Sequence, residues 1–432
     1  MTRSFQAIVV GAGPAGSSAA LAMARGGLDV ALLERGNFPG EKNMFGGLLH
    51  RMTSLEAYIP EYWRKAPIER HVNKKNLTFM NADSMVNLQL ESGNFDRAPY
   101  NGYTVLRPKF DNWLARQAVK AGATLITRAM VDDVIVEQGQ VKGVTVLGRT
   151  GTLCAPVVIA ADGVLSFIAA KAGLRAPAFK PDQMAVGVKA LYDLPKQVID
   201  DRFGLIRNQG VANEFVGCTA GVRGGGCLYT NYDSVSIGLV AHIGSLQKSK
   251  KTPCDLLNEF TAHPHMKKLL RGGRLMEYSA HAIPEGGYGM VPQLVGNGIL
   301  VAGDAAAFCN VTGLHLEGVN LASHSGLLAA QTVIEAHKTQ DFSTQGLQGY
   351  TTLLDNSFVM KDLKKFKRAP GMLHNDRIFN AYPDLACRLM EDAYRIDGTP
   401  KKGVAKLALD TVKKTIGVKN IARDIFSAWR AL

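Results

Sequence analysis

Cysteine is sparse in this chain of 432 residues, and its placement excludes several kinds of metal site. The six cysteines are dispersed and form no C-x-x-C pair: Cys154, Cys218, Cys227, Cys254, Cys309 and Cys387. Iron–sulfur clusters and structural zinc need clustered thiolates, so we expect neither, nor any other bound metal. His263-Pro-His265 lacks a nearby cysteine or carboxylate, which favours a surface or helix-end position over a metal site. Isolated cysteines are typical of small buried residues in a reducing compartment.

Long uncharged apolar runs are also nearly absent. The exception follows Arg3 and extends from Phe5 to Ala24. Its length suits a membrane span, and its end, Ala22-Met-Ala24, resembles a signal-peptidase site. However, its glycines, a proline and two serines make it a poor apolar core for a signal peptide or membrane span. Export also does not explain the following apolar strand that ends at an acidic residue. We therefore expect a cytoplasmic protein, or one that is peripheral on the inner face of the cell membrane.

Acidic residues are outnumbered, since 37 Asp and Glu against 50 Lys and Arg give a net charge of +13. This excess favours contact with an anionic membrane surface or an acidic protein. Nucleic acid is not an expected partner, because the basic residues are dispersed and no nucleic-acid-binding motif occurs. A hydrophobic content of 46% in 432 residues predicts an ordered globular chain with a large core and two interleaved domains.

A complete dinucleotide-binding pattern occupies the N-terminus. The apolar run from Phe5 to Val10 predicts a buried strand, which ends at Gly11-Ala-Gly13-Pro-Ala-Gly16. Small residues then predict a helix from Pro14 to Arg25, and a second apolar strand ends at Glu34. This order of strand, glycine turn, helix, strand and acid is far more specific than the glycine motif alone.

Each part of the pattern has a physical role in binding a nucleotide. Gly11 permits the tight turn, Gly13 lets the backbone approach a pyrophosphate, and Gly16 lets the helix lie close to the strands. The helix N-terminus offers free N–H groups and a partial positive charge to phosphates. Glu34 follows Gly16 by 18 residues (34 − 16) and suits hydrogen bonds from a ribose.

The remaining pattern predicts that this nucleotide fold is interrupted and completed late. We expect a helix over 108–121, a strand over 124–127, a hairpin around Gly139, one strand over 153–160, strands of a second sheet over 185–280, a strand over 298–302 and a helix over 316–336. The predicted parts are 1–184 and 281–345 for the nucleotide-binding domain, 185–280 for an inserted sheet domain on the substrate side, and 346–432 for a helical, basic C-terminal region.

Four motifs together resemble the FAD-binding glutathione-reductase-type fold, a Rossmann-like α/β fold, in its hydroxylase-like branch: Gly11-x-Gly13-x-x-Gly16, Glu34-Arg35, Ala161-Asp162-Gly163 and Gly303-Asp304. Further segments resemble the electron-transfer-flavoprotein:quinone oxidoreductases, and among them the short bacterial proteins of FixC type: Glu34-Arg-Gly36, Pro39-Gly40, Lys42-Asn43, Gly46-Gly47, Tyr229-Thr-Asn231, Pro284-Glu-Gly-Gly-Tyr288, Gly303-Asp-Ala-Ala-Ala307 and Leu314-His-Leu-Glu-Gly318. The resemblance covers nearly the whole chain. It implies FAD as cofactor, an inserted mixed β-sheet domain and a helical C-terminal region.

The resemblance also implies which residues hold FAD. The glycine turn would bind the pyrophosphate, Glu34 the adenosine ribose, Arg107 and Asp304 the phosphate–ribityl region, and the backbone of Val131 the adenine. The turn over 313–320 would offer N–H groups to the flavin pyrimidine edge. The expected contacts are Gly11, Gly13, Pro14, Ala15, Gly16, Glu34, Arg35, Gly46, Gly47, Arg107, Val131, Asp162, Gly163, Gly303, Asp304, Gly318 and Asn320. An ion-pairing or surface role for Arg107, and a simple turn at Gly46-Gly47, remain alternatives.

One departure from the family bears on partners. Its longer members carry a four-cysteine ferredoxin-like segment at the C-terminus, whereas Cys387 is the only cysteine here beyond residue 345. The resemblance therefore implies a separate small ferredoxin-like iron–sulfur protein, besides a two-subunit electron-transfer flavoprotein. The resemblance implies quinone, ferredoxin or both as the electron acceptor.

The predicted function is that of an FAD-dependent oxidoreductase relaying electrons from an electron-transfer flavoprotein to quinone or a ferredoxin-like partner. The alternatives are a flavin-dependent reductase or monooxygenase acting on an isoprenoid or aromatic molecule, and an FAD-bound scaffold without redox activity. The sequence has no second glycine-rich motif for NAD(P)H and no G-x-S-x-G nucleophile. Because electron transfer needs no side-chain acid or base, no catalytic residue is predicted.

Three features allow more than one interpretation. His315 and Glu317 suit either a proton path to quinone or ordinary polar contacts. Tyr229 suits either a quinone pocket or packing in the sheet. A basic C-terminal helix carries an apolar stripe that would contact a membrane, a partner or the protein's own core: Ile421, Ile425, Trp429 and Leu432.

Overall fold

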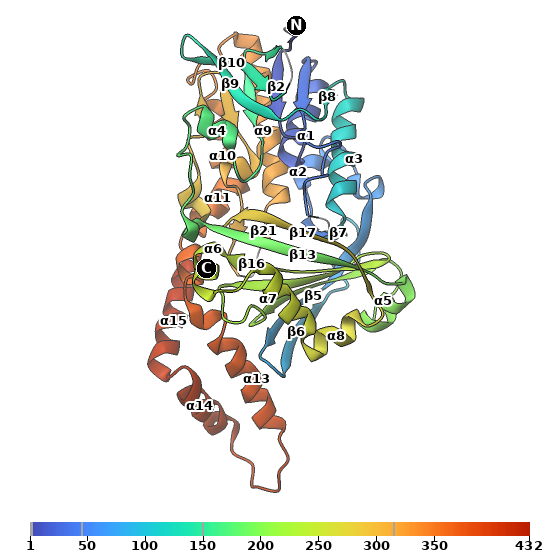
Figure 1. The fold of residues 1–432 in the computed structure, drawn as a ribbon, viewed down its shortest axis with the longest axis vertical. Coiled ribbons are helices and arrows are strands. Elements are labelled where there is room, and N and C mark those ends of the chain that lie inside the picture. Colours follow the sequence, from blue (N-terminus) through green and yellow to red (C-terminus); the bar gives the residue numbers. More distant parts are fainter. Residues whose placement is uncertain (1–2, 45, 149–150, 314–315) are drawn as a thin grey trace.

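A computed structural model describes residues 3–44, 46–148, 151–313 and 316–432. The chain is elongated (Figure 1), with one sheet and its helices at the top, a second sheet across the middle and the C-terminal helices extending below. A cavity lies where the first two layers meet.

The first sheet has the six-stranded order β18-β19-β12-β2-β3-β8, and its strands are parallel except for β18. Its members are β2 (Ala7–Val10), β3 (Val30–Leu33), β8 (Thr124–Ile126), β12 (Val158–Ala160), β18 (Val295–Gly296) and β19 (Ile299–Val301). All residues of β2, β3 and β12 are buried, which is typical of a parallel sheet covered on both faces. The predicted nucleotide-type sheet is therefore present.

Three helices pack together beside this sheet: α1 (Pro14–Arg25), α3 (Arg107–Lys120) and α9 (Val319–Thr339). α1 begins and ends at the predicted residues and is buried from Pro14 to Ala24. A Cβ placed on Gly326 of α9 would lie 2.1 Å from the carbonyl oxygen of Ala15 in α1, so glycine is what permits this close helix crossing. Among the described residues, no helix combines the length and apolar character needed to cross a membrane.

A small sheet of four strands lies at the outer end of the molecule: β1 (Arg3–Ser4), β9 (Val131–Glu137), β10 (Gln140–Val146) and β11 (Thr152–Cys154). The predicted hairpin around Gly139 is confirmed, since β9 and β10 pair across it and Gly139 has a φ of +76°. The prediction of one strand over 153–160 is wrong. β11 and β12 belong to different sheets, and Pro156, which has no N–H to donate, lies between them.

The second sheet has nine strands in the order β17-β13-β16-β15-β14-β5-β7-β4, with β6 paired to β5. Their bounds are β4 (Gly47–His50), β5 (Ile68–Met80), β6 (Met85–Glu91), β7 (Gly102–Val105), β13 (Met184–Asp193), β14 (Gln209–Val216), β15 (Gly224–Thr230), β16 (Ser234–His242) and β17 (Arg274–Pro284). β4 to β7 come from residues 47–105, which were predicted to belong to the nucleotide-binding part. β14 joins them to the later strands through a parallel pairing with β5, a long-range contact that no local pattern reports. The division into domains stays a prediction.

Four helices cover the face of this sheet that points away from the first sheet. They are α5 (Lys196–Phe203), α6 (Ile243–Ser249), α7 (Pro253–Ala262) and α8 (Pro264–Leu270). α2 (Thr53–Glu56) and α4 (Phe167–Lys171) are short connectors, and β20 (Asn310–Val311) pairs with β21 (Leu316–Glu317). His263 caps the N-terminus of α8 by accepting from the His265 N–H, which agrees with a helix-end position.

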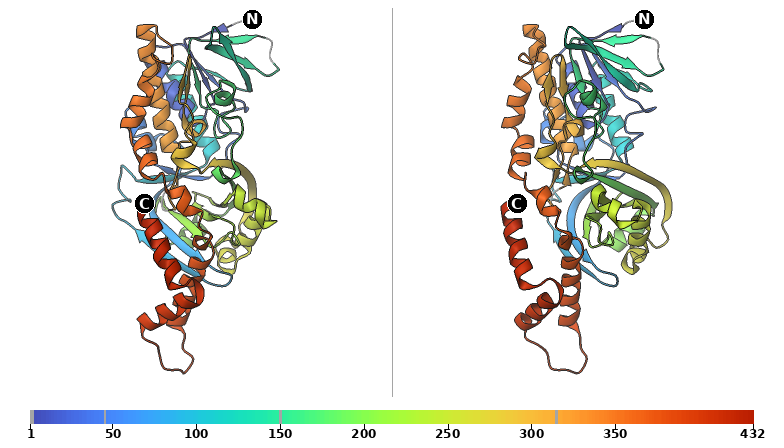
Figure 2. Two further views of the ribbon diagram at one scale, coloured as in Figure 1. Left: turned by 90° about the vertical axis from the view of Figure 1, so that its left-hand side faces the viewer. Right: turned by 60° about the vertical axis from the view of Figure 1, so that its left-hand side comes forward.

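The tail is helical, as predicted: α10 (Gly349–Asn356), α11 (Phe358–Lys365), α12 (Ala369–Leu373), α13 (Ala381–Tyr394), α14 (Val404–Thr415) and α15 (Val418–Ala431). α10 and α11 contact α9, whereas α13 contacts β5 and β6. In the views of Figure 2, α14 and the adjoining ends of α13 and α15 extend beyond the second sheet, and α15 runs back toward the level of that sheet. Most of this unit therefore lies outside the two main hydrophobic cores.

Candidate functional site

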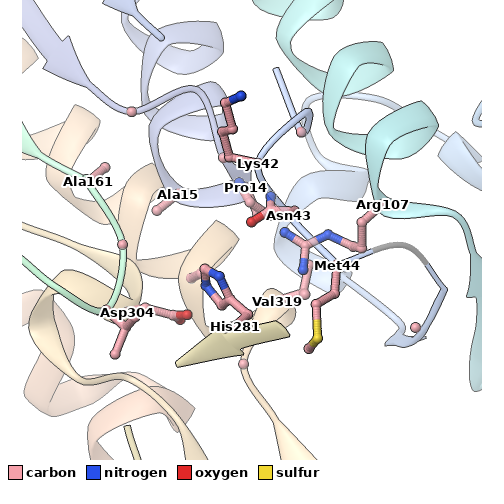
Figure 3. Close-up of a pocket in the computed structure, with 18 of the residues that line it drawn as sticks. Pro14, Ala15, Lys42, Asn43, Met44, Arg107, Ala161, His281, Asp304 and Val319 are labelled. Atoms are coloured by element: carbon pink, nitrogen blue, oxygen red, sulfur yellow. The ribbon is translucent and has the colours of Figure 1, made fainter. Parts of the chain in front are cut away.

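A cavity of about 360 Å³ lies between the carboxyl ends of the first sheet's strands and one face of the second sheet. All of the predicted cofactor contacts line it except Gly16 and Gly303, which are buried directly behind it. Figure 3 shows side chains converging on it from α1, α3, β17 and the segment around Asn43. Segments that are distant in sequence are thus brought to one place, as expected for a ligand at the carboxyl edge of a parallel sheet.

The glycine turn has the geometry of an anion cradle. Gly11 has a φ of +100°, and a Cβ there would lie 2.3 Å from the Ala161 carbonyl oxygen. Gly13 is the N-cap of α1, with open space where its Cβ would be, and Pro14 is the first helical residue. No side chain caps this helix, so its first N–H groups are available to a phosphate. A Cβ on Gly16 would lie 1.9 Å from the Gly11 carbonyl oxygen, which explains a glycine behind the cavity wall.

Glu34 directly follows β3 and lies beside this turn. Its carboxylate accepts from the backbone N–H of Gly36 at 2.7 Å and of Ala12 at 3.3 Å. Burial raises the pKa of Glu34, and the two backbone donors oppose that rise. The carboxylate is therefore held in place by the motif itself, at the mouth of the glycine turn.

Two polar side chains of the cavity carry groups suited to a ligand's donors. The Asn320 side chain donates to Glu317 at 2.7 Å, but its buried Oδ1 has no partner among the described residues. Asp162 accepts from the Ile168 N–H at 3.1 Å, and burial raises its pKa to about 6. A buried acceptor without a donor is costly, so a ligand N–H at Asn320 would relieve that cost.

Arg107 is tied to its own helix as well as exposed to the cavity. Its guanidinium donates to both oxygens of Asp111 at 2.9 Å, and Asn43 also donates to Asp111, at 2.5 Å. Burial raises the pKa of Asp304, and the charge of Arg107 opposes that rise. Arg107 therefore forms an ion pair, as one alternative proposed, and also lies in the cavity wall (Figure 3).

The face of the second sheet supplies residues that the prediction did not include as sites: Lys189, Glu214 and His281, together with Lys42, Met44 and Cys309 from outside that face. Tyr229, for which a pocket and a packing position were both considered, also lines the cavity and is 5% exposed. A lysine inside an otherwise apolar strand, Val186-Gly-Val-Lys-Ala-Leu191, was the available signal for Lys189. His315 lies outside the described residues, whereas Glu317 lines the cavity.

Comparison with known proteins identifies the family. Residues 6–177 match the model of FAD-dependent oxidoreductases, and residues 369–432 match the C-terminal domain of the ETF-QO/FixC family. The chain is 43% identical over 97% of its length to the probable electron transfer flavoprotein-quinone oxidoreductase YdiS of Escherichia coli, covering 97% of that protein. It is 39% identical to protein FixC of Bradyrhizobium diazoefficiens, over 99% of both chains. The chain belongs to the ETF-QO/FixC family. It is accordingly an FAD-dependent oxidoreductase, and the resemblance found in its motifs is confirmed.

Solved structures of similar shape agree on the fold. A geranylgeranyl bacteriochlorophyll reductase-like protein of Thermoplasma acidophilum superposes with a TM-score of 0.74 at 21% identity, over 99% of this chain and 100% of its own. A flavoprotein/dehydrogenase of Cytophaga hutchinsonii superposes with a TM-score of 0.62 at 18% identity, over 99% of both chains. At such identities the likeness shows the fold alone, which is the predicted FAD-binding α/β fold with mixed sheets and C-terminal helices.

The family's C-terminal domain ends in α15, whose apolar stripe was predicted. The alternative in which this stripe packs on the protein's own core is wrong, because Ile425 is 63% exposed and Trp429 is 77% exposed. The helix is instead held through its polar side. Asp424 accepts from Arg377 at 2.5 and 2.7 Å and from Tyr382 at 3.0 Å. These contacts turn the apolar stripe outward.

Proposed function

We propose that this ETF-QO/FixC family member holds FAD in the cavity and passes electrons from an electron-transfer flavoprotein to quinone. The observation that carries the proposal is the continuity of one cavity, from the anion cradle of α1 to a polar face of the second sheet. The bound flavin would supply the electron chemistry, and the protein supplies position and charge.

The residues present fit FAD at its polar end. The free N–H groups at the start of α1 and the positive end of its dipole suit the pyrophosphate, and Glu34 suits the ribose hydroxyls. The unpartnered Oδ1 of Asn320 suits an N–H donor such as that on the flavin's pyrimidine edge. Arg107 and Asp304 would hold the region between, and Val131 the adenine.

Partners follow from the relatives' names and from the resemblance. YdiS is named as a probable electron transfer flavoprotein-quinone oxidoreductase, which supports a two-subunit flavoprotein donor and a quinone acceptor here. A small ferredoxin-like iron–sulfur protein is proposed as a further partner, because Cys387 alone among the cysteines lies in the family's C-terminal domain. A cluster ligated by several cysteines would then have to come from another chain.

Contact with a membrane surface is proposed for the C-terminal unit. α15 exposes Ile425, Phe426 and Trp429, and α14 and α15 together carry lysines and arginines on exposed positions. Apolar and aromatic side chains beside basic ones are the composition of helices that lie in an anionic interface. A quinone dissolved in the bilayer would then meet the protein at its cytoplasmic surface.

The function is tested by reducing the purified holoprotein and offering acceptors. We expect a yellow protein that releases FAD on denaturation, is reduced by reduced electron-transfer flavoprotein, and is reoxidised by decylubiquinone. Rapid bleaching by NADH alone, or oxygen insertion into an isoprenoid or aromatic compound, would instead establish the flavin-dependent reductase or monooxygenase alternative. For the membrane contact, Trp429→Glu should lower cosedimentation with phosphatidylglycerol vesicles, while Leu353→Glu on α10, an exposed apolar control, should not.

A further inference from the structure

The pocket face of the second sheet carries one row of polar side chains. Lys189 of β13 lies opposite Gly238 of β16, Gly238 lies opposite Cys227 of β15, and Cys227 lies opposite Glu214 of β14. Directly opposed residues point to the same face, so these side chains share the face that lines the cavity. Tyr229 follows two residues after Cys227 on the same strand and therefore shares this face as well.

Gly238 creates the space in which the Lys189 side chain lies. A Cβ on Gly238 would be 2.4 Å from Cγ of Lys189, so any other residue would push the lysine stem aside. The ammonium group then reaches two partners. It donates to the carbonyl oxygen of Gly46 at 2.7 Å, and it lies 5.2 Å from the ring centroid of Tyr229. Its position over the sheet is thus built by its neighbours rather than left to a flexible stem.

No carboxylate among the described residues forms an ion pair with Lys189. Burial lowers the pKa of Lys189, the charge of Arg107 lowers it further, and Cys227 opposes them. Arg107 itself is paired with Asp111, whereas Lys189 is a cation of the cavity wall without a carboxylate partner among the described residues. A lone ammonium in a partly dry pocket stabilises negative charge that develops on a ligand, and a lowered pKa makes it a better proton donor.

We propose that Lys189 binds the oxygen of the quinone that accepts the electrons, and protonates it. The inference rests on the proposed function. The bound flavin, in its reduced form, would supply two electrons and one proton. The second proton comes from Lys189, whose N–H bond breaks as the quinol O–H bond forms, and water then reprotonates the amine. Tyr229 orients the ammonium through its ring, and the Gly46 carbonyl holds it against the segment that lines the cavity.

Binding can be measured without turnover. Titration of the oxidised holoprotein with oxidised decylubiquinone should show affinity about tenfold weaker for Lys189→Met, the loss of one charged hydrogen bond. Lys189→Arg keeps the charge and should retain most of the affinity. Lys338→Met removes an exposed lysine paired with Glu335 on α9 and serves as the matched control. Equal affinity of the Met variant and the wild type would contradict the inference.

Proton transfer is tested by comparing two acceptors of electrons from the reduced holoprotein in stopped flow. Decylubiquinone needs protons, whereas ferricenium takes one electron and none. Lys189→Met should slow the reaction with decylubiquinone by about 100-fold and leave that with ferricenium unchanged. Lys189→Arg should keep KM and lose kcat, because a guanidinium does not release its proton.

The pH profile gives an independent readout. The wild-type quinone rate should fall as pH rises through the lowered pKa of Lys189, and this step should be absent in Lys189→Met. The groups that face the amine are Arg107, Cys227 and Tyr229, with Glu214 beyond Cys227. Tyr229→Phe keeps the ring and should keep the step, which separates the lysine from the phenol. Failure of the wild type with decylubiquinone but not ferricenium would overturn the proposed function and this inference together; equal quinone rates in wild type and Lys189→Met would overturn the inference alone.

Discussion

Replacing Gly326 by alanine tests the close helix crossing on which the nucleotide cradle depends. The added Cβ would lie 2.1 Å from the Ala15 carbonyl oxygen and 3.1 Å from its Cα, both in α1. These are backbone atoms, which have no rotamer to change, so α9 and α1 must move apart. Ala15 also lines the cavity, and the shift would therefore displace the first turn of α1 from any phosphate bound there.

The magnitude follows from two opposed effects. Overpacking of a buried site costs about 1–3 kcal/mol, and the rigid backbone partner places this case at the upper end. Alanine in a helix recovers about 1 kcal/mol relative to glycine. The net loss is about 2 kcal/mol, which corresponds to a fall in melting temperature of about 2 °C for a chain of this length. FAD content per chain should fall as well.

Thermal melting of the holoprotein and flavin absorbance per chain are the assays. Gly349→Ala is the matched control. Gly349 is a helical glycine like Gly326, at the first position of α10, but a Cβ placed on it would have no atom within 4 Å. That variant should melt at or slightly above the wild-type temperature. A Gly326→Ala protein that melts at or above the wild type, with full FAD content, would refute the argument.

Three further outcomes are expected. Glu34→Gln should weaken FAD binding about tenfold in equilibrium dialysis. Because burial raises the pKa of Glu34, the wild-type affinity should fall with decreasing pH before an ordinary carboxyl would protonate, and the glutamine variant should lack this fall. Arg70→Met removes a guanidinium that donates to Asp200 and to three backbone carbonyls. It should lower the free energy of unfolding by about 3 kcal/mol and lower the melting temperature. Removing the exposed ion pair between Arg274 and Asp193 should leave the melting temperature unchanged. Hydrogen bonds from Arg377 and Tyr382 lower the pKa of Asp424 to about 2. The attachment of α15 is therefore complete above about pH 4 and is lost as pH falls toward 2. Asp424→Asn should speed proteolysis of residues 418–432 at neutral pH.

The sequence by itself determined the local elements of the nucleotide-binding part. The turn at Gly11, the bounds of α1 and the strand ending at Glu34 are specified by residues within one short stretch, whose periodicity and glycines have few other uses. The same holds for the hairpin around Gly139. Fold and family followed because these local signals occur in a specific order.

Only the tertiary structure decided which distant residues meet. Strands from residues 47–105 pair with the later sheet because β5 lies beside β14, and hydrogen bonds between strands depend on spatial neighbours rather than on sequence distance. Lys189 becomes a cavity residue because Gly238 leaves room for its side chain and the carbonyl oxygen of Gly46 accepts a hydrogen bond from its ammonium group. The stripe of α15 was visible as a pattern, but whether it faces a core depended on Arg377 and Tyr382, which hold the helix through Asp424. Periodicity encodes the shape of a segment, whereas its surroundings are set by the packing of all the others.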